Sequence, residues 1–215
     1  MSAMTDADIA STPLWAGADP LVLASKSASR RALLTAACLP VEVLAANIDE
    51  RASERRHFAG GGLAEGLAAT LAEAKAVAVS ALRPDSYCLG ADQTLILGGT
   101  ILHKPRDLAE AAQSLEALSG RTHRLISAFC IARSGKALVI EADHADLHMR
   151  PLDRRTIERY LELAGPAVLS SVGAYQIEGL GMHLFDRIDG DFTTILGIPM
   201  LKLLAWLRHQ RLISL

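Results

Sequence analysis

The chain has 215 residues, of which half are hydrophobic and only 4% aromatic, with 22 basic and 24 acidic side chains. Its net charge of −2 provides no overall field for nucleic acid or an anionic membrane, so neither is an expected partner. The length suits one domain with an aliphatic core, in which an anion site must come from the local placement of a few Arg and Lys residues.

Residues 1–20 carry acidic side chains and no apolar run, which argues against a signal peptide or a transmembrane segment. We expect a flexible N-terminal extension there, held by Leu14 and Trp15, followed by a single domain over 21–215. Next, the apolar run 21–25 predicts a central strand.

A helix is predicted to follow that strand and to end before Pro40, and a second strand over 41–46. The polar stretch 47–58 predicts a loop. Over 63–82 a long helix is predicted, because leucine and alanine recur there every three or four residues.

The second half of the chain alternates strands, turns and helices. The expected elements are a strand at 87–97 with a hairpin return at Gly98-Gly99, a helix at 107–120, strands at 123–132 and 137–149, a helix at 154–165, a strand within 182–192 and a last helix opened by Pro199. This order predicts the α/β class with a mixed sheet.

Cys38, Cys88 and Cys130 are widely separated, and each lies among apolar neighbours. Disulfide frameworks and zinc sites need paired spacings such as C-x-x-C, which this chain lacks. We therefore expect buried, reduced thiols in a cytoplasmic protein.

Polar residues follow the first strand in the stretch LVLASKSASRRALL. The free N–H groups at the start of the next helix favour an anion, and Ser25, Ser27 and Ser29 add hydroxyl donors. Arg30 and Arg31 add planar groups suited to phosphate oxygens. The pattern fits an anion-binding turn, and it equally fits a serine that caps the helix beside two solvated arginines.

Asp92 lies within an otherwise apolar strand, where a carboxylate costs free energy unless it is paired, bound to a metal or at an exposed end. A structural aspartate and a general base or metal ligand both fit this position. Lys75, at the edge of the apolar stripe over 63–82, and Lys104, before Pro105, are further cations able to reach a cleft.

Together these motifs resemble the Maf proteins, a family of nucleoside triphosphate pyrophosphatases, from residue 21 to about residue 208. The matching segments are LVLASKSASRRALL, NIDE, LAEAKA, LGADQTLILGGTILHKPRD, LEALSGRTH and SVGAYQIEGLGMHLFDRIDGDFTTILGIP. The resemblance implies an elongated mixed β-sheet flanked by helices, with two lobes and a central cleft. It also implies hydrolysis of nucleoside triphosphates, including unusual or modified ones, to the monophosphate and pyrophosphate as a house-cleaning activity.

The resemblance further implies a divalent cation, usually Mg²⁺, and a homodimer. By position, Asp92 resembles the proton acceptor, and Glu50 and Asp92 resemble metal ligands. The residues that resemble a substrate-binding set are Ser25, Ser27, Arg30, Arg31, Lys75 and Lys104.

Three positions bear on the choice of base, namely Ser29, Gln93 and Glu178. Many relatives read S-P-R-R where this chain reads S-A-S-R, and the branch acting on dTTP and UTP reads A-D-T and I-Q-G where this chain reads A-D-Q and I-E-G. Gln93 and Glu178 resemble the branch acting on 7-methyl-GTP, although that branch tends to carry tryptophan in place of Ser29. A carboxylate at Glu178 suits guanine N–H groups or a cationic methylated base, which favours a purine or modified base without fixing it.

A non-catalytic nucleotide-binding regulator is the competing function, since the family name is tied to inhibition of septum formation. A serine hydrolase using Ser25 or Ser27 is disfavoured, because the chain lacks the G-x-S-x-G turn.

Overall fold

The computed structural model describes residues 14–215, so most of the predicted N-terminal extension, residues 1–13, lies outside the described residues. Leu14 and Trp15 pack against the hydrophobic core, and Trp15 forms a β-bridge with Ile213. Within the described residues, no helix has both the length and the apolarity needed to cross a membrane.

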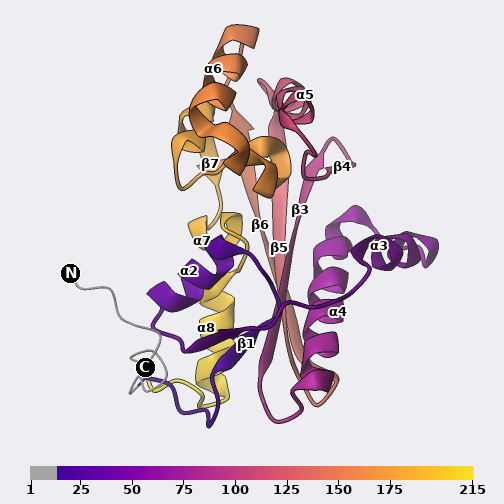
Figure 1. Ribbon diagram of the computed structural model, residues 1–215, viewed down its shortest axis with the longest axis vertical. Helices are drawn as coiled ribbons and strands as arrows, with labels where there is room; N and C mark the ends of the chain where they lie inside the picture. The colour runs from indigo at the N-terminus through magenta and orange to yellow at the C-terminus, as the bar shows by residue number, and fades with distance from the viewer. Residues whose placement is uncertain (1–13) are drawn as a thin grey trace.

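One seven-stranded mixed sheet runs along the long axis of the molecule (Figure 1). Its strand order is β2-β1-β3-β5-β6-β7, with β4 paired to β3. The strands are β1 (Leu21–Leu23), β2 (Val41–Val43), β3 (Cys88–Leu97), β4 (Thr100–Leu102), β5 (Thr122–Arg133), β6 (Lys136–Met149) and β7 (Phe185–Asp189). The β1–β2 and β1–β3 pairs are parallel and the other pairs antiparallel, which confirms the predicted mixed α/β sheet.

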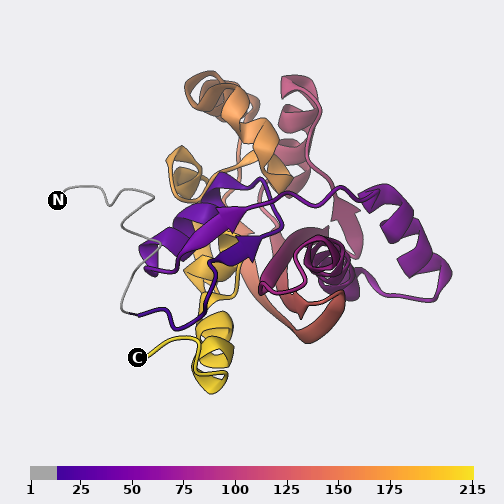
Figure 2. The same cartoon turned by 60° about the horizontal axis from the view of Figure 1, so that its bottom comes forward.

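The two faces of the sheet follow from the two-residue alternation of a β-strand. On β5, Phe129 and Ile131 face α2 (Ala28–Ala36) and α8 (Met200–His209). The alternate residues of β5 face α4 (Leu67–Leu82), whose alanines allow close packing. Figure 2 shows α4 on one side of the sheet and α2 with α8 on the other.

The face opposite α4 carries two separate hydrophobic clusters along the same strands. Leu89 and Ala91 of β3 belong to the cluster under α2 and α8. Further along β3, Leu95 and Leu97 belong to a second cluster with α5 (Leu108–Leu118) and α6 (Arg154–Ala164). These clusters are the cores of the two expected lobes, shown at the bottom and top of Figure 1.

Between α6 and β7 the chain forms only short 3₁₀ turns, at Gly165–Ser170, Val172–Ala174 and Leu180–Leu184. Two more short elements are the 3₁₀ turn Ala64–Gly66 and α7 (Phe192–Ile195). None of these five carries a long periodic pattern, and the sequence did not predict them.

The predicted loop at 47–58 is wrong, because α3 (Glu50–Ala59) occupies this stretch and projects from the body of the molecule (Figure 1). Asp49 caps it by accepting from the Ala52 amide at 2.9 Å, and Glu50 in its first turn complements the helix dipole. Ser53 is its one buried residue, so α3 has no apolar stripe from which a periodic pattern could be recognised.

The cysteine prediction holds for Cys88 and Cys130, which are buried, but is wrong for Cys38, which is exposed. Cys38 lies in the turn after α2, where it adopts a left-handed φ of 54°. Burial raises the pKa of Cys88 to about 11 and that of Cys130 to about 12, so both thiols stay protonated near neutral pH.

Candidate active site

A gap in the strand pairing of β3 opens the cleft between the two lobes. On one edge β3 pairs with β1 up to Leu89 and with β4 from Leu95, so on that edge residues 90–94 have no neighbouring strand, while the other edge pairs with β5. Peptide groups on such an open edge are available to side chains. The cleft here has a volume of about 820 Å³ and is lined by residues from both lobes.

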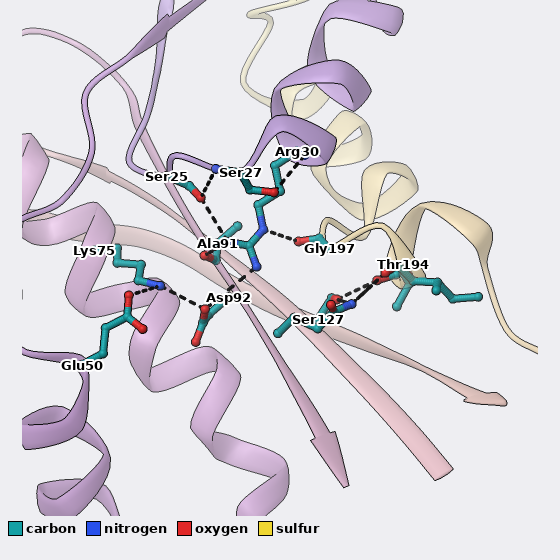
Figure 3. Close-up of polar contacts among 12 residues, drawn as sticks. Ser25, Ser27, Arg30, Glu50, Lys75, Ala91, Asp92, Ser127, Thr194 and Gly197 are labelled. Carbon is teal, nitrogen blue, oxygen red and sulfur yellow. Dashed lines mark hydrogen bonds and ion pairs between the residues drawn. The ribbon is translucent and has the colours of Figure 1, made fainter. Parts of the chain in front are cut away.

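Arg30 fills the floor of this gap and is 9% exposed. Its Nη1 donates to the edge carbonyl of Ala91 at 2.8 Å and to Ser25 Oγ at 3.1 Å, and its Nε donates to the Gly197 carbonyl at 3.2 Å (Figure 3). Nη2 lies 3.9 Å from Asp92 Oδ1. Burial lowers the pKa of Arg30, against the opposing effects of the nearby carboxylates. Guanidinium nevertheless stays charged in proteins, so Arg30 supplies a fixed positive charge.

Ser25 and Ser27, which precede α2, have different hydrogen-bonding roles. Ser27 caps the helix, because its Oγ accepts from the Arg30 amide at 3.4 Å. Ser25 Oγ accepts from the Ser27 amide at 3.2 Å and from Arg30, which leaves its hydroxyl proton free to be donated into the cleft. The predicted serine cap is confirmed at Ser27, while the expected solvation is wrong for Arg30, which is buried at the cleft.

Lys75 joins the two predicted carboxylates of the site (Figure 3). Its Nζ donates to Asp92 Oδ1 at 3.0 Å and lies 2.8 Å from Glu50 Oε1. The side chains of Lys75 and Asp92 are 9% and 14% exposed, whereas that of Glu50 is 55% exposed. Gly90 makes this meeting possible, because a Cβ there would lie only 2.1 Å from the Ala72 carbonyl oxygen of α4.

Lys104 lies in the same cleft, on the segment after β4. Burial lowers its pKa, Arg30 and Lys75 lower it further, and Asp92 opposes these effects. Arg30, Lys75, Lys104 and Asp92 all line this one cleft. In the described part of the chain, Lys104 has no ion-pair partner, so its ammonium is available to a ligand.

The three positions predicted to bear on the choice of base also line the cleft. Ser29 Oγ donates to Glu178 Oε1 at 3.2 Å and so connects α2 to the second lobe. The Gln93 amide nitrogen donates to the carbonyls of Ile195 at 2.8 Å and Thr194 at 3.3 Å. This fixes the direction of the Gln93 side chain, whose oxygen remains an acceptor.

The structure brings ten of the eleven predicted site residues to the cleft, while Arg31 lies exposed on α2 and is absent from the cleft lining. The sequence reasoning missed Lys26, Arg51 and His103, which also line it. Lys26 and Arg51 directly follow Ser25 and Glu50 in the chain, and this adjacency was the available signal.

Comparison with known proteins shows the family of the chain. A family model described as Maf-like protein matches residues 20–210. A nucleoside triphosphate pyrophosphatase of Nitrobacter winogradskyi is 50% identical over 202 residues, which cover 94% of this chain and 99% of the relative. A 7-methyl-GTP pyrophosphatase of Brucella abortus is 49% identical over 90% of this chain and 98% of the relative. Another, of Rhizobium etli, is 50% identical over 88% of this chain and 95% of the relative. The chain therefore belongs to the family of Maf-like proteins.

Proposed function

We propose that this chain is a nucleoside triphosphate pyrophosphatase that releases the nucleoside monophosphate and pyrophosphate. The observation that carries the proposal is the convergence of Arg30, Lys75 and Lys104 on the cleft that holds Asp92. A triphosphate bears about four negative charges that repel a nucleophile, so cleavage needs grouped cations that face a general base. Relatives that match nearly the whole chain are named for this reaction, which supports the proposal.

Several donors remain available for phosphate oxygens. Lys75 has three ammonium protons, of which Asp92 and Glu50 accept two. Ser25 can donate its hydroxyl proton, and Lys104 its ammonium protons. Arg30 already uses Nε and Nη1 within the protein, so Nη2 is the nitrogen left to contact the substrate.

Asp92 is the proposed general base. A water oxygen attacks the α-phosphorus while Asp92 accepts a proton from that water. The bond from the α-phosphorus to the bridging oxygen then breaks, and pyrophosphate leaves with the bonding electrons. The cations stabilise the charge that builds on the phosphate oxygens during this step.

Glu50 and Asp92 would hold Mg²⁺. Each contacts Lys75 through one carboxylate oxygen, and within the described chain the second oxygen of each has no protein partner. Mg²⁺ in proteins is commonly bound by one or two carboxylates together with water and substrate phosphates, and these two residues fit that pattern. When bound, the ion would neutralise part of the phosphate charge.

A purine or modified base, with 7-methylguanine as the leading candidate, is the proposed substrate class. Ser29 fixes Glu178 through Oε1, so Oε2 can accept N–H groups of a guanine edge. Two of the similar relatives are named 7-methyl-GTP pyrophosphatases, which supports this choice. A cytoplasmic homodimer completes the proposal, on the strength of the family resemblance.

A panel of triphosphates with Mg²⁺ tests the function. We expect pyrophosphate release from at least one of GTP, 7-methyl-GTP, UTP and dTTP, with the methylated purine the best substrate. A non-catalytic regulator of septum formation would bind nucleotide and release no pyrophosphate from any member, and that result would overturn the proposal.

A further inference from the structure

The cleft wall formed by residues 175–178, here called the nucleoside wall, has little regular structure of its own. It lies between two 3₁₀ turns, and its backbone–backbone bonds are local, with the amides of Gly179 and Gly181 donating to the Gln176 carbonyl. The backbone of Gln176 also hydrogen-bonds the Tyr160 side chain of α6. Such a segment takes its position from side-chain contacts with the rest of the fold. Since it carries Glu178, its position bears directly on the proposed base site.

His123 provides one of these contacts. It lies on β5, it is 2% exposed, and its Nε2 lies 2.7 Å from Tyr175 Oη, the first residue of the nucleoside wall. Its Nδ1 is also buried and has no partner among the described residues. An unpaired buried nitrogen costs free energy that a leucine here would not cost, so the bond to Tyr175 accounts for a histidine at this position.

Ring packing reinforces that bond from two directions. The Tyr175 ring meets the Phe185 ring of β7 edge to face with centroids 4.8 Å apart, and His123 lies 5.9 Å from Phe185. Gly173 fits closely beneath the tyrosine, because a Cβ there would lie 2.7 Å from the Tyr175 ring. Tyr175 is thereby held by β5, β7 and its own turn.

We propose that His123 is a positioning residue that acts through Tyr175 to hold the nucleoside wall where it can contact the base. The triphosphate group of the substrate is held independently of this contact. The triphosphate residues lie on β3, α2, α4 and the segment after β4, and none of their hydrogen bonds or ion pairs reaches His123 or Tyr175. This inference rests on the proposed function, which the wild-type panel tests separately.

The test compares binding of the base with binding of the phosphates. The double variant His123→Phe/Tyr175→Phe removes both polar partners and keeps two rings, so it should fold with nearly unchanged stability. His123→Gln is the conservative control, because its side-chain amide nitrogen can replace Nε2. For each variant we would measure KM and kcat for the best nucleotide of the panel, and Ki for inorganic tripolyphosphate, which has no base.

We expect the double variant to raise KM about fivefold, the effect of one net hydrogen bond, with kcat and the tripolyphosphate Ki unchanged. The KM of the His123→Gln variant should lie closer to the wild-type value than the KM of the double variant does. An unchanged KM in the folded double variant, or equal rises in KM and Ki, would show that His123 serves only the core. An inactive wild type would instead reject the proposed function itself.

Discussion

At the scale of single residues, Asp92, which is paired with Lys75, is the proposed general base. We expect Asp92→Asn to lower kcat at least about a hundredfold, because an amide cannot accept the proton while its size preserves the packing. Steady-state pyrophosphate release, with a thermal melt to confirm folding, checks this. Asp186→Asn, an exposed change on β7, is the matched control and should retain activity. Wild-type turnover in folded Asp92→Asn would remove Asp92 from the role of base.

Glu178 is the residue proposed to select the base, and its test belongs to the same scale. We expect Glu178→Gln to shift the ratio of kcat/KM values towards UTP and dTTP by roughly tenfold, because an amide offers both a donor and an acceptor to a pyrimidine edge. The kcat/KM values of the whole panel give the measurement, with exposed Glu141→Gln as the control. An unaltered order and spacing of substrates would separate Glu178 from base recognition.

At the scale of elements, the site depends on how closely α4 approaches β3. We expect Gly90→Ala to reduce stability by about 3 kcal/mol or more and to abolish most activity, because its Cβ would collide with the Ala72 carbonyl and push Lys75 away from Asp92. Thermal melts and kinetics of the same preparation check both effects. Gly60→Ala, whose Cβ would lie 3.4 Å from its nearest neighbour, should be tolerated. A stable, fully active Gly90→Ala would show that α4 can move without consequence.

The elements differ in how far their sequences reveal them. α4 and α5 were predictable because leucine and alanine recur on one side, and β3 and β5 because long apolar runs end in turns. α3 was not, since it is polar all round and its signal was the single cap at Asp49. The 3₁₀ turns between α6 and β7 follow from contacts such as that of His123 with Tyr175, which no local pattern encodes.

At the scale of the whole molecule, acid should destabilise the fold through His123. Burial lowers the pKa of His123 from 6.5 to about 4, with Asp146 opposing and His148 adding to the shift. Between those values the unfolded chain binds a proton that the folded chain does not, so stability falls as pH falls from 6.5 to 4, by up to about 3 kcal/mol. Denaturant titrations at a series of pH values measure this, and the curve for the double Phe variant should be flatter. A wild-type curve as flat as the variant's would contradict the assignment.

The residues of the site were predictable as types and positions, whereas their meeting was predicted through the family resemblance and not from any local pattern. Ser25, Arg30 and Asp92 stand out because they are polar residues that interrupt an apolar strand or begin a helix. Burying a polar group costs free energy, and a functional role accounts for that cost. Arg31 has the same local signal as Arg30, and only the direction of α2 separates the buried guanidinium from the exposed one. The hydrogen bond from Arg30 to the Ala91 carbonyl depends on the open edge of β3, which is a property of the assembled sheet.

Three paired strands, β3, β5 and β6, run without interruption from one hydrophobic cluster to the other. A polypeptide cut to a single lobe would carry these strands with half of their apolar side chains uncovered, so neither half is expected to exist as a separate folded unit. The proposed nucleotide site thus spans a stiff, hydrogen-bonded sheet rather than a hinge, and large closure would require bending all three strands at once.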